Sequence, residues 1–497
     1  MFNLIEEKWI PVIRRSGSVS MMAPWEITDT DDPPLKVRFT RQDMNSAVTQ
    51  FLIGLVQTTM TPADEDEWLD LLERRPSSEE LRARMLSVKD AFELIGGPHP
   101  FMQETGIEGN KTIDSLILTS PGENTVKLNK DFFIKRSSGE SCLCLSCTAA
   151  TVYTMQALAP VGGSGYSCSI RGSCPLTTML EGEDLFSTVF LNVLSQNNLV
   201  GDSKDMIFPW MSDTRGDVLY SSENDPRMVY WTTVRRLSLG DVVQGRCMLC
   251  GRESSVITDY NTVNKGTIFK DWVHPLCPYS SDNTRLVPIM VRDNIGHFDQ
   301  WTYMIYEIGS GIRPALVVSQ LKRNRKDVSE ILGNHHIRLW ISGYLNDKAL
   351  VKGWKEMRQP ILMDYDNNTE LLIRTSIEKI IGLTDFGLKQ LISALGILYG
   401  SRDPDKKNKT SKIPSDTKER FWSECDSIFP EAVRRISSEY DQSIFADWGS
   451  SLRSITMSIF DDYSDCLPFE YYQNVARGRR FLLTRLSEKS IEKELSK

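Results

Sequence analysis

Two Cys-x-x-Cys pairs constrain the fold of this chain more than any other feature. Cys144 and Cys147 form the first pair, Cys247 and Cys250 form the second, and 99 residues lie between them. Two such pairs can supply the four thiolates of a closed, tetrahedral zinc site. Because the pairs are so far apart, a shared metal would join two distant loops of one domain. The alternatives are ordinary free cysteines, or one redox pair beside a βαβ unit.

The composition is that of a globular protein in a reducing compartment. Hydrophobic residues make up 40% and charged residues 25% of the 497 positions, which excludes a disordered or fibrous chain. Ten cysteines are too sparse at this length for a disulfide scaffold. We find no export signal and no apolar run of the ~18–20 residues that a membrane span needs. We therefore expect a cytoplasmic protein with no membrane partner.

The net charge of −8 excludes a simple basic coat for naked nucleic acid, because phosphate binding depends on clustered cations. Basic residues nevertheless gather locally, for example Lys127, Lys130, Lys135 and Arg136 around Phe132-Phe133. Aromatic side chains beside cations suit single-stranded RNA, whose bases can stack while its phosphates pair with the cations.

The fold class that the pattern predicts is α+β. Residues 1–366 mix helical and strand-like segments with long irregular loops, and residues 367–497 read as an all-α four-helix bundle. In the first region we expect a buried helix over Asp43–Met60 and a hairpin over Arg338–Gly353. Further helices are expected at Ala63–Arg74, Ser78–Leu94 and Thr148–Ala159, and strands at Tyr230–Leu239, Leu286–Val291 and Trp301–Ile308. The bundle helices are expected at Thr369–Tyr399, Asp416–Tyr440, Ser443–Phe460 and Pro468–Glu494.

A glycine-rich loop, Pro160-Val161-Gly162-Gly163-Ser164-Gly165, follows the predicted helix Thr148–Ala159. Glycines allow close approach of the backbone to a ligand, although the P-loop pattern is not met because no Lys-Ser/Thr follows. A flexible connection is the alternative. We find no catalytic constellation: the five histidines make no HExxH motif, and there is no GxSxG elbow.

These features occur in an order that resembles the CasA-type large subunit of the type I-E CRISPR Cascade complex. The matching runs are NLIEEKWIPV (3–12), TRQDM (40–44), HPFMQ (99–103), FFIKRSSGESCLCLSCTA (132–149), APVGGSGYSCSIRGSCPLTT (159–178), DLFSTVFLNVL (184–194) and CMLCGRES (247–254). They are collinear and span most of the chain, and the predicted helical C-terminus fits the family's second domain.

The resemblance implies a non-catalytic recognition subunit. In the family, this subunit lies at the 5′ handle of the crRNA and inspects the protospacer-adjacent motif of the target double-stranded DNA. It promotes local unwinding so that the guide can pair, and it helps to recruit a separate helicase–nuclease effector. The implied partners are the crRNA 5′ handle, target DNA, the other Cascade subunits and that effector. Base pairing reads the long sequence, while the protein reads only a short duplex element.

The resemblance also assigns roles to residues of this chain. The handle-binding loop falls on Phe133, Ile134 and Lys135, and the minor-groove-reading glycine loop falls on Val161, Gly162, Gly163, Ser164 and Gly165. Lys265 matches the family's lysine finger. The strand-separating wedge falls on the turn Asn346, Asp347 and Lys348, with Lys348 where the family has glutamine. Cys144, Cys147, Cys247 and Cys250 match zinc-bearing positions.

Two other functions remain open. The chain could be a CxxC-dependent redox enzyme, which needs a reversible, low-pKa thiol pair rather than inert zinc thiolates. It could also be a structural scaffold that binds RNA and neighbouring subunits without contacting DNA.

Overall fold

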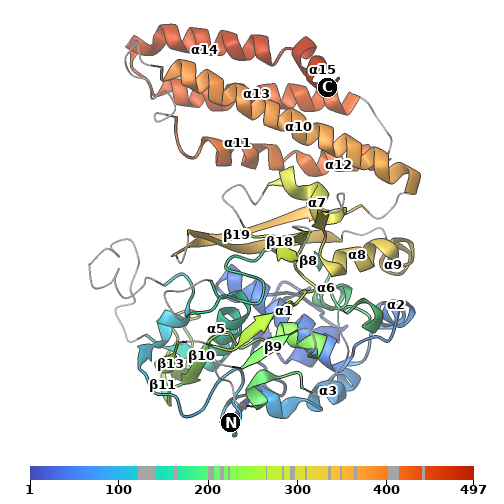
Figure 1. Ribbon diagram of the computed structural model, residues 1–497, viewed down its shortest axis with the longest axis vertical. Coiled ribbons are helices and arrows are strands. Elements are labelled where there is room, and N and C mark those ends of the chain that lie inside the picture. The colour runs from blue at the N-terminus through green and yellow to red at the C-terminus, as the bar shows by residue number, and fades with distance from the viewer. Residues whose placement is uncertain are drawn as a thin grey trace. The chain divides into compact units, whose positions relative to one another are not determined.

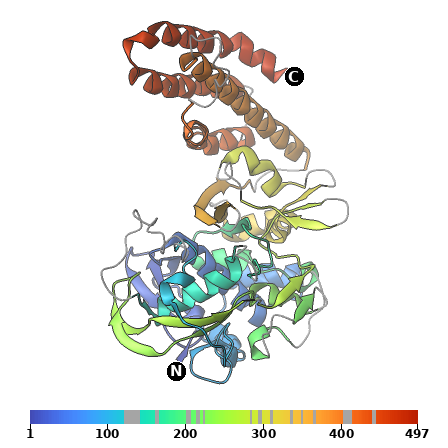
Figure 2. The same cartoon turned by 60° about the vertical axis from the view of Figure 1, so that its left-hand side comes forward.

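The computed structural model describes all residues except 121–140, 161–165, 200–205, 213–217, 222–223, 265, 282–284, 292–296, 308–310, 334–336, 348–349, 363–366, 401–412, 439–442 and 497. The chain forms two compact units (Figures 1 and 2). Unit 1 consists of Met1–Ile295 and Tyr303–Ile361, and unit 2 of Gly296–Thr302 and Leu362–Lys497. The short segment Gly296–Thr302 therefore packs with the C-terminal helices, although it lies within the first region of the sequence.

Helix α1 (Gln42–Thr59) is the centre of unit 1, as its apolar spacing predicts. Its Phe51 ring makes edge-on contacts with five aromatic rings, at centroid distances of 5.4 to 5.9 Å. These rings belong to Trp9, Phe92, Phe101, Tyr153 and Trp231. Such edge-to-face pairs add to the energy of simple area burial. The core thus gathers residues from segments more than two hundred positions apart.

The other helices of unit 1 are short. Several begin with a side-chain cap that satisfies a free backbone N–H: Asp64 accepts from Glu67 N, Ser77 from Glu80 N and Asp184 from Ser187 N. The helices are α2 (Glu65–Glu73), α3 (Ser78–Leu86), α5 (Leu145–Leu158), α6 (Leu185–Leu191), α8 (Leu316–Arg323) and α9 (Arg325–Leu332). Helices α5 and α6 both contact α1 (Figure 1).

The strands of unit 1 form small separate sheets rather than one large sheet, and every pairing among the described residues is antiparallel except β14 with β9. The sheet orders are β1–β5, β3–β2–β4, β10–β13–β6, β11–β12–β7, β14–β9, β16–β15–β17 and β19–β18–β8. The strands are β1 (Phe2–Asn3), β2 (Ile10–Arg14), β3 (Val19–Met22), β4 (Pro34–Val37), β5 (Glu93–Ile95), β6 (Lys111–Thr112), β7 (Leu143–Cys144), β8 (Thr177–Glu181), β9 (Leu219–Ser221), β10 (Arg236–Leu239), β11 (Val242–Arg246), β12 (Glu253–Ile257), β13 (Asp259–Val263), β14 (Ile268–Lys270), β15 (Tyr279–Ser281), β16 (Leu286–Pro288), β17 (Ile312–Arg313), β18 (Arg338–Asp347) and β19 (Leu350–Pro360).

Three predictions in this region are wrong in detail. The expected strand Trp301–Ile308 begins as helix α7 (Trp301–Ile305); its β-prone side chains are almost all buried, and tertiary packing overrides such propensities. The expected helix Ser78–Leu94 ends at Leu86, and the chain continues through a 3-10 turn into β5. The expected strand Tyr230–Leu239 begins only at Arg236.

Unit 2 confirms the expected all-helical C-terminal region, but two of the four expected helices are each broken into two. The helices are α10 (Asn367–Leu398), α11 (Thr417–Asp426), α12 (Phe429–Ser438), α13 (Ser443–Asp465), α14 (Tyr472–Arg485) and α15 (Glu488–Leu495). Pro430 lies in the first turn of α12, where its missing N–H is tolerated. Ser487 has an extended backbone that ends α14 and begins α15. Helix α10 lies along α13 and α14 (Figures 1 and 2).

One described helix, Thr369–Leu398 within α10, is long and apolar enough to cross a membrane by length and composition alone, with a mean hydropathy of 1.3. Its apolar side chains are shared with the bundle, however: Ile377, Leu391 and Leu395 are fully buried against the neighbouring helices. Charged residues such as Arg374 and Glu378 pair along its surface. A helix with one buried face and one charged face is a core helix of a helical bundle.

Candidate metal centre and nucleic-acid interface

The structure brings the four predicted cysteine ligands together. The Sγ atoms of Cys144, Cys147, Cys247 and Cys250 all lie within 4.8 Å of one another. Strand β7 ends at Cys144, whose Sγ accepts the Cys147 N–H at 3.5 Å and so caps helix α5. Strand β12 pairs with both β7 and β11, and this pairing holds the two Cys-x-x-Cys pairs side by side.

The second pair lies in a tight turn after β11. Cys247 O accepts from Gly251 N at 2.9 Å, and Cys247 N donates to Arg252 O at 2.8 Å. Gly251 has a positive φ of 74°, which glycine adopts without strain. The turn therefore directs the thiols of Cys247 and Cys250 toward the first cysteine pair. A hydrogen bond from Met248 N to Cys142 O, at 2.9 Å, joins this turn to the segment that carries the first pair.

The sulfur geometry fits a tetrahedral metal. Zn–S bonds of ~2.3 Å place the sulfurs of a tetrahedron about 3.8 Å apart, and Cys144 Sγ lies 3.7 Å from Cys250 Sγ. Cys142 is outside the cluster because its thiol donates to Arg246 O at 2.8 Å. Its presence in the run CLCLSC therefore does not change the ligand set.

The electrostatics of the cluster also favour a dication. A hydrogen bond from the Cys147 thiol lowers the pKa of Cys250 to about 6. Hydrogen bonds from Cys144 and Cys147 lower the pKa of Cys247. In turn, hydrogen bonds to Cys144, Cys247 and Cys250 raise the pKa of Cys147. Without metal the four sulfurs must share protons because adjacent thiolates repel, whereas a bound dication allows all four to ionise.

The glycine loop 161–165 lies outside the described residues, but both of its ends are described. We call Ala159–Pro160 and Ser167–Ser169 the loop neck. Ser169 N donates to Ala159 O at 2.8 Å and closes the neck. The Arg235 guanidinium donates to Pro160 O at 2.8 Å and also to Ser167 O, so it joins the two sides.

Lys265 also lies outside the described residues, and its neighbour Gly266 lies beside the loop neck's arginine. A Cβ on Gly266 would lie 2.0 Å from Val234 O and 2.9 Å from Arg235 N. No side chain fits at this position. The fold therefore places Gly266, the neighbour of Lys265, and the glycine loop neck beside the same residue, Arg235, although the sequence separates them by about a hundred positions.

The predicted hairpin is confirmed as β18 and β19, which pair from Arg338↔Pro360 to Asp347↔Leu350. Lys348 and Ala349, which follow Asp347 in the sequence, lie outside the described residues. Asn346 is in strand β18, and its Nδ2 donates to Ser173 O at 2.7 Å. Asp347 ends the strand. The prediction that Asn346 and Asp347 form the turn is thus wrong, because both continue strand β18 and pair with β19.

The remaining predicted binding residues, Phe133, Ile134 and Lys135, lie in the segment 121–140 and are outside the described residues. The ends of that segment are described. It follows the 3-10 turn Ile113–Leu116 beyond β6 and precedes β7, which leads directly into the first cysteine pair. The predicted handle loop is therefore adjacent in sequence to the thiol cluster.

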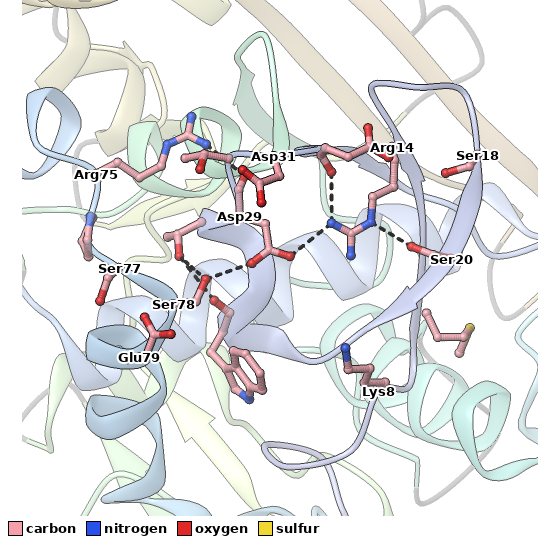
Figure 3. Close-up of a pocket in the computed structure, with 16 residues that line it drawn as sticks. Lys8, Arg14, Ser18, Ser20, Asp29, Asp31, Arg75, Ser77, Ser78 and Glu79 are labelled. Carbon is pink, nitrogen blue, oxygen red and sulfur yellow. Dashed lines mark hydrogen bonds and ion pairs between the residues drawn. The ribbon is translucent and has the colours of Figure 1, made fainter.

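A polar cavity of about 870 Å³ lies elsewhere in unit 1, between β2, β3 and the start of α3 (Figure 3). Its charged groups satisfy one another. Arg14 donates to Ser20 at 2.8 Å and to Asp29 at 3.1 Å, while Ser78 donates to Asp29 at 2.9 Å. These contacts tie β2 and β3 to the start of α3 and so stabilise the fold around the cavity.

Sequence reasoning missed Arg235 and the buried Gln156 that holds it. Arg235 lies in an ordinary Val-Arg-Arg-Leu run, and no motif distinguishes it from the next residue. Only the tertiary structure separates the two arginines, because Arg236 pairs with Glu104 while Arg235 contacts the loop neck.

Solved structures share this two-unit fold. Thermus thermophilus CasA superposes with a TM-score of 0.75 at 16% identity, covering 98% of this chain and 99% of that one. Thermobifida fusca Cse1 gives 0.76 at 14% identity, covering 100% and 98%. A chain of a "CRISPR RNA-guided surveillance complex" gives 0.68 at 14% identity, covering 97% and 99%. At these identities the likeness establishes the fold alone.

The family assignment is more specific. The family model for the CRISPR-associated protein Cse1 matches residues 3–459, which is most of the chain. This protein belongs to the Cse1 family, also called CasA, as the sequence runs indicate.

Proposed function

We propose that this chain is the non-catalytic large subunit of a type I-E CRISPR RNA-guided surveillance complex, and that it recognises the protospacer-adjacent motif of target DNA. The observation that carries the proposal is the convergence of two predicted reading elements. The neck of the glycine loop and the flank of Lys265 meet at Val234–Arg235. Backbone atoms of glycines can approach a minor-groove floor, and a lysine can reach its base-edge acceptors.

In this proposal each element has a separate task. The segment with Phe133, Ile134 and Lys135 contacts the 5′ handle of the crRNA. Val161–Gly165 and Lys265 read the motif, and Lys348 at the tip of the β18–β19 hairpin separates the first base pair. The bound complex then recruits the helicase–nuclease effector. Guide pairing reads the remaining target sequence.

We also propose that the metal is zinc and that its role is structural. Cys144, Cys147, Cys247 and Cys250 would hold it, and their full set of four protein ligands leaves no open position for catalysis. The metal would fix the end of the handle segment to β11 and β12. Strand β13, which leads to Lys265, follows β12 directly.

The test compares binding of duplexes with and without the motif by the assembled guide-RNA complex. Lys265→Ala and Gly163→Leu should each reduce this discrimination by roughly five- to 150-fold, since one groove contact or a blocked approach is worth about 1–3 kcal/mol. Lys270→Ala is the matched control because it removes the same charge from an exposed position on β14. Unchanged discrimination in both test variants would refute the site assignment.

The same preparations test the alternative functions. A scaffold that contacts no DNA predicts that a cross-linker at position 265 labels RNA or protein only. A redox enzyme predicts metal-free protein with rapid disulfide cycling of Cys144 and Cys147. Our proposal predicts DNA cross-links at the motif and stoichiometric zinc.

A further inference from the structure

Arg235 joins the two sides of the glycine loop neck through a planar fork. One terminal nitrogen donates to Pro160 O at 2.8 Å, and the other donates to Ser167 O. Guanidinium is rigid and presents its donors in a fixed arrangement. Together with the Ala159–Ser169 backbone bond, this contact sets the separation and direction of the chain where it enters and leaves the loop.

Arg235 is itself fixed by a buried glutamine of helix α5. Gln156 Nε2 donates to Arg235 O at 2.8 Å, and Gln156 Oε1 accepts from Arg235 N at 2.8 Å. Gln156 is fully buried. Helix α5 therefore holds both backbone groups of Arg235 through Gln156, and the same helix leads into the loop neck. The position of the arginine relative to the loop neck is fixed as a result.

The other side of the same segment holds the flank of Lys265. In the β10–β13 sheet, Arg236 lies opposite Val263 at the end of β13. Gly266 packs against the backbone of Val234–Arg235 so closely that no Cβ fits. Displacing the backbone of Val234–Arg235 would therefore move both the loop neck, which Arg235 binds, and Gly266, which packs against that backbone.

The charge of Arg235 has no carboxylate partner among the described residues. Its polar contacts are carbonyl oxygens, and its guanidinium lies 5.0 Å from the centre of the Tyr166 ring. A cavity of about 300 Å³ beside it is lined by Tyr166, Tyr260 and Lys111. An uncompensated cation next to an open cavity creates a local positive potential on an acidic protein.

We propose that Arg235 is a positioning residue for motif recognition. Its side chain holds the two sides of the glycine loop neck at a fixed separation, and its charge, which has no carboxylate partner among the described residues, favours the phosphate backbone of a duplex beside that neck. This inference rests on the proposed function and adds a residue that contacts neither a base nor the metal.

The first experiment measures motif discrimination and total DNA affinity in the assembled complex. Arg235→Gln should lower discrimination roughly tenfold, comparable with loss of one groove contact, and should also weaken binding to motif-free duplex. Arg235→Lys retains the charge but lacks the fork, so it should keep the motif-free affinity and still lose discrimination. Arg236→Gln is the matched control: it removes one charge at the adjacent position, and both quantities should stay within about twofold.

The second experiment separates positioning from general stability. Hydrogen exchange of the purified chain should quicken selectively in peptides covering 157–170 when Arg235 is replaced by Lys, with the melting temperature nearly unchanged. A general loss of protection across unit 1 would instead mean that Arg235 is only a structural residue.

The outcomes distinguish this inference from the proposed function. If Lys265→Ala and Gly163→Leu lose discrimination while Arg235→Lys discriminates like the parent, the role of Arg235 is refuted and the proposed function stands. If all three variants discriminate normally, the proposed function fails. If Arg235→Gln does not assemble, the Arg235→Lys result alone decides.

Discussion

The two units each join segments that are distant in the sequence, but they do so with different chemistry. Unit 1 has an apolar core around Phe51, and it adds polar contacts at a few points: four clustered thiols join β7 to the turn after β11, and Arg235 joins the two sides of the loop neck. In unit 2, the segment Gly296–Thr302 inserts the fully buried Phe298 among the rings of Trp422, Phe429 and Trp448. Point contacts fix geometry, whereas apolar packing mainly supplies stability. The comparison indicates that unit 1 adds polar point contacts at its loop ends to an apolar core of its own.

The largest effect should come from breaking the thiol cluster. Cys147→Ser removes one of four ligands, and we expect loss of the metal with destabilisation of unit 1 on the order of 5 kcal/mol or more. Elemental analysis and thermal unfolding measure both quantities. Cys466→Ser, at an exposed cysteine of unit 2, is the control and should change neither. A metal-free parent protein would contradict this prediction.

The next effect tests the apolar attachment of unit 2. Phe298 stacks on Phe429 with ring centroids 4.2 Å apart and has no exposed surface. Phe298→Ala should destabilise unit 2 by about 3–5 kcal/mol because it leaves a cavity in a packed core. Fluorescence-detected denaturation would measure this loss. Metal content should remain that of the parent, and a parallel loss of metal would show that the two units do not unfold separately.

A smaller effect is expected at the sheet that carries the hairpin. The buried carboxylate of Glu181 on β8 binds Arg338 at 2.7 Å and Arg358 at 3.0 Å, and also Lys36 at 3.2 Å. Burial alone would raise the pKa of Glu181, but Arg358 and the other cations outweigh it and lower that pKa. Glu181→Gln should cost about 2 kcal/mol, since the cations are partly exposed and screened. Urea denaturation measures the change; Glu356→Gln, which leaves Glu181 in place, should cost less.

The smallest effect is a pH dependence confined to unit 2. Burial raises the pKa of Asp299 to about 7. Burial opposes protonation of His297, but its contact with Asp426 at 2.6 Å and its neighbour Glu419 prevail and raise its pKa. Both groups bind protons more tightly in the folded chain, so their stabilisation is present at low pH and is lost as the pH rises through the folded-state values.

We therefore expect unit 2 to lose about 1–2 kcal/mol between pH 5 and 8. Thermal unfolding at several pH values measures this change, with Asp299→Asn as the comparison variant that should flatten most of the profile. A rise in stability with pH would contradict the assignment.

Some elements of secondary structure could be predicted from the sequence and others could not. Helix α1 was predictable because its apolar positions recur at helical spacing, and the β18–β19 hairpin because its flanks are β-prone. The strand predicted at Trp301–Ile308 was wrong because a short buried segment has no periodicity that separates helix from strand. The breaks at Pro430 and Ser487 were missed because each interrupts an otherwise continuous amphipathic pattern.

The four candidate metal ligands show what sequence spacing alone can predict. Two Cys-x-x-Cys pairs identified Cys144, Cys147, Cys247 and Cys250 as one candidate set, because this local spacing is set by the geometry of a single metal. Their approach to within 4.8 Å depends on the β7–β12–β11 pairing, which no local pattern encodes.

The amino-acid sequence by itself thus determined the family, the candidate thiol ligands and the division into a mixed region followed by helices. All of these follow from the local spacing of residues and the order of motifs along the chain. Only the tertiary structure decided that Arg235 differs from Arg236, that Gly266 has no room for a side chain, and that Phe298 belongs to the helical unit. Those properties depend on long-range packing, in which the partner of each residue is chosen by the whole fold rather than by its neighbours in the chain.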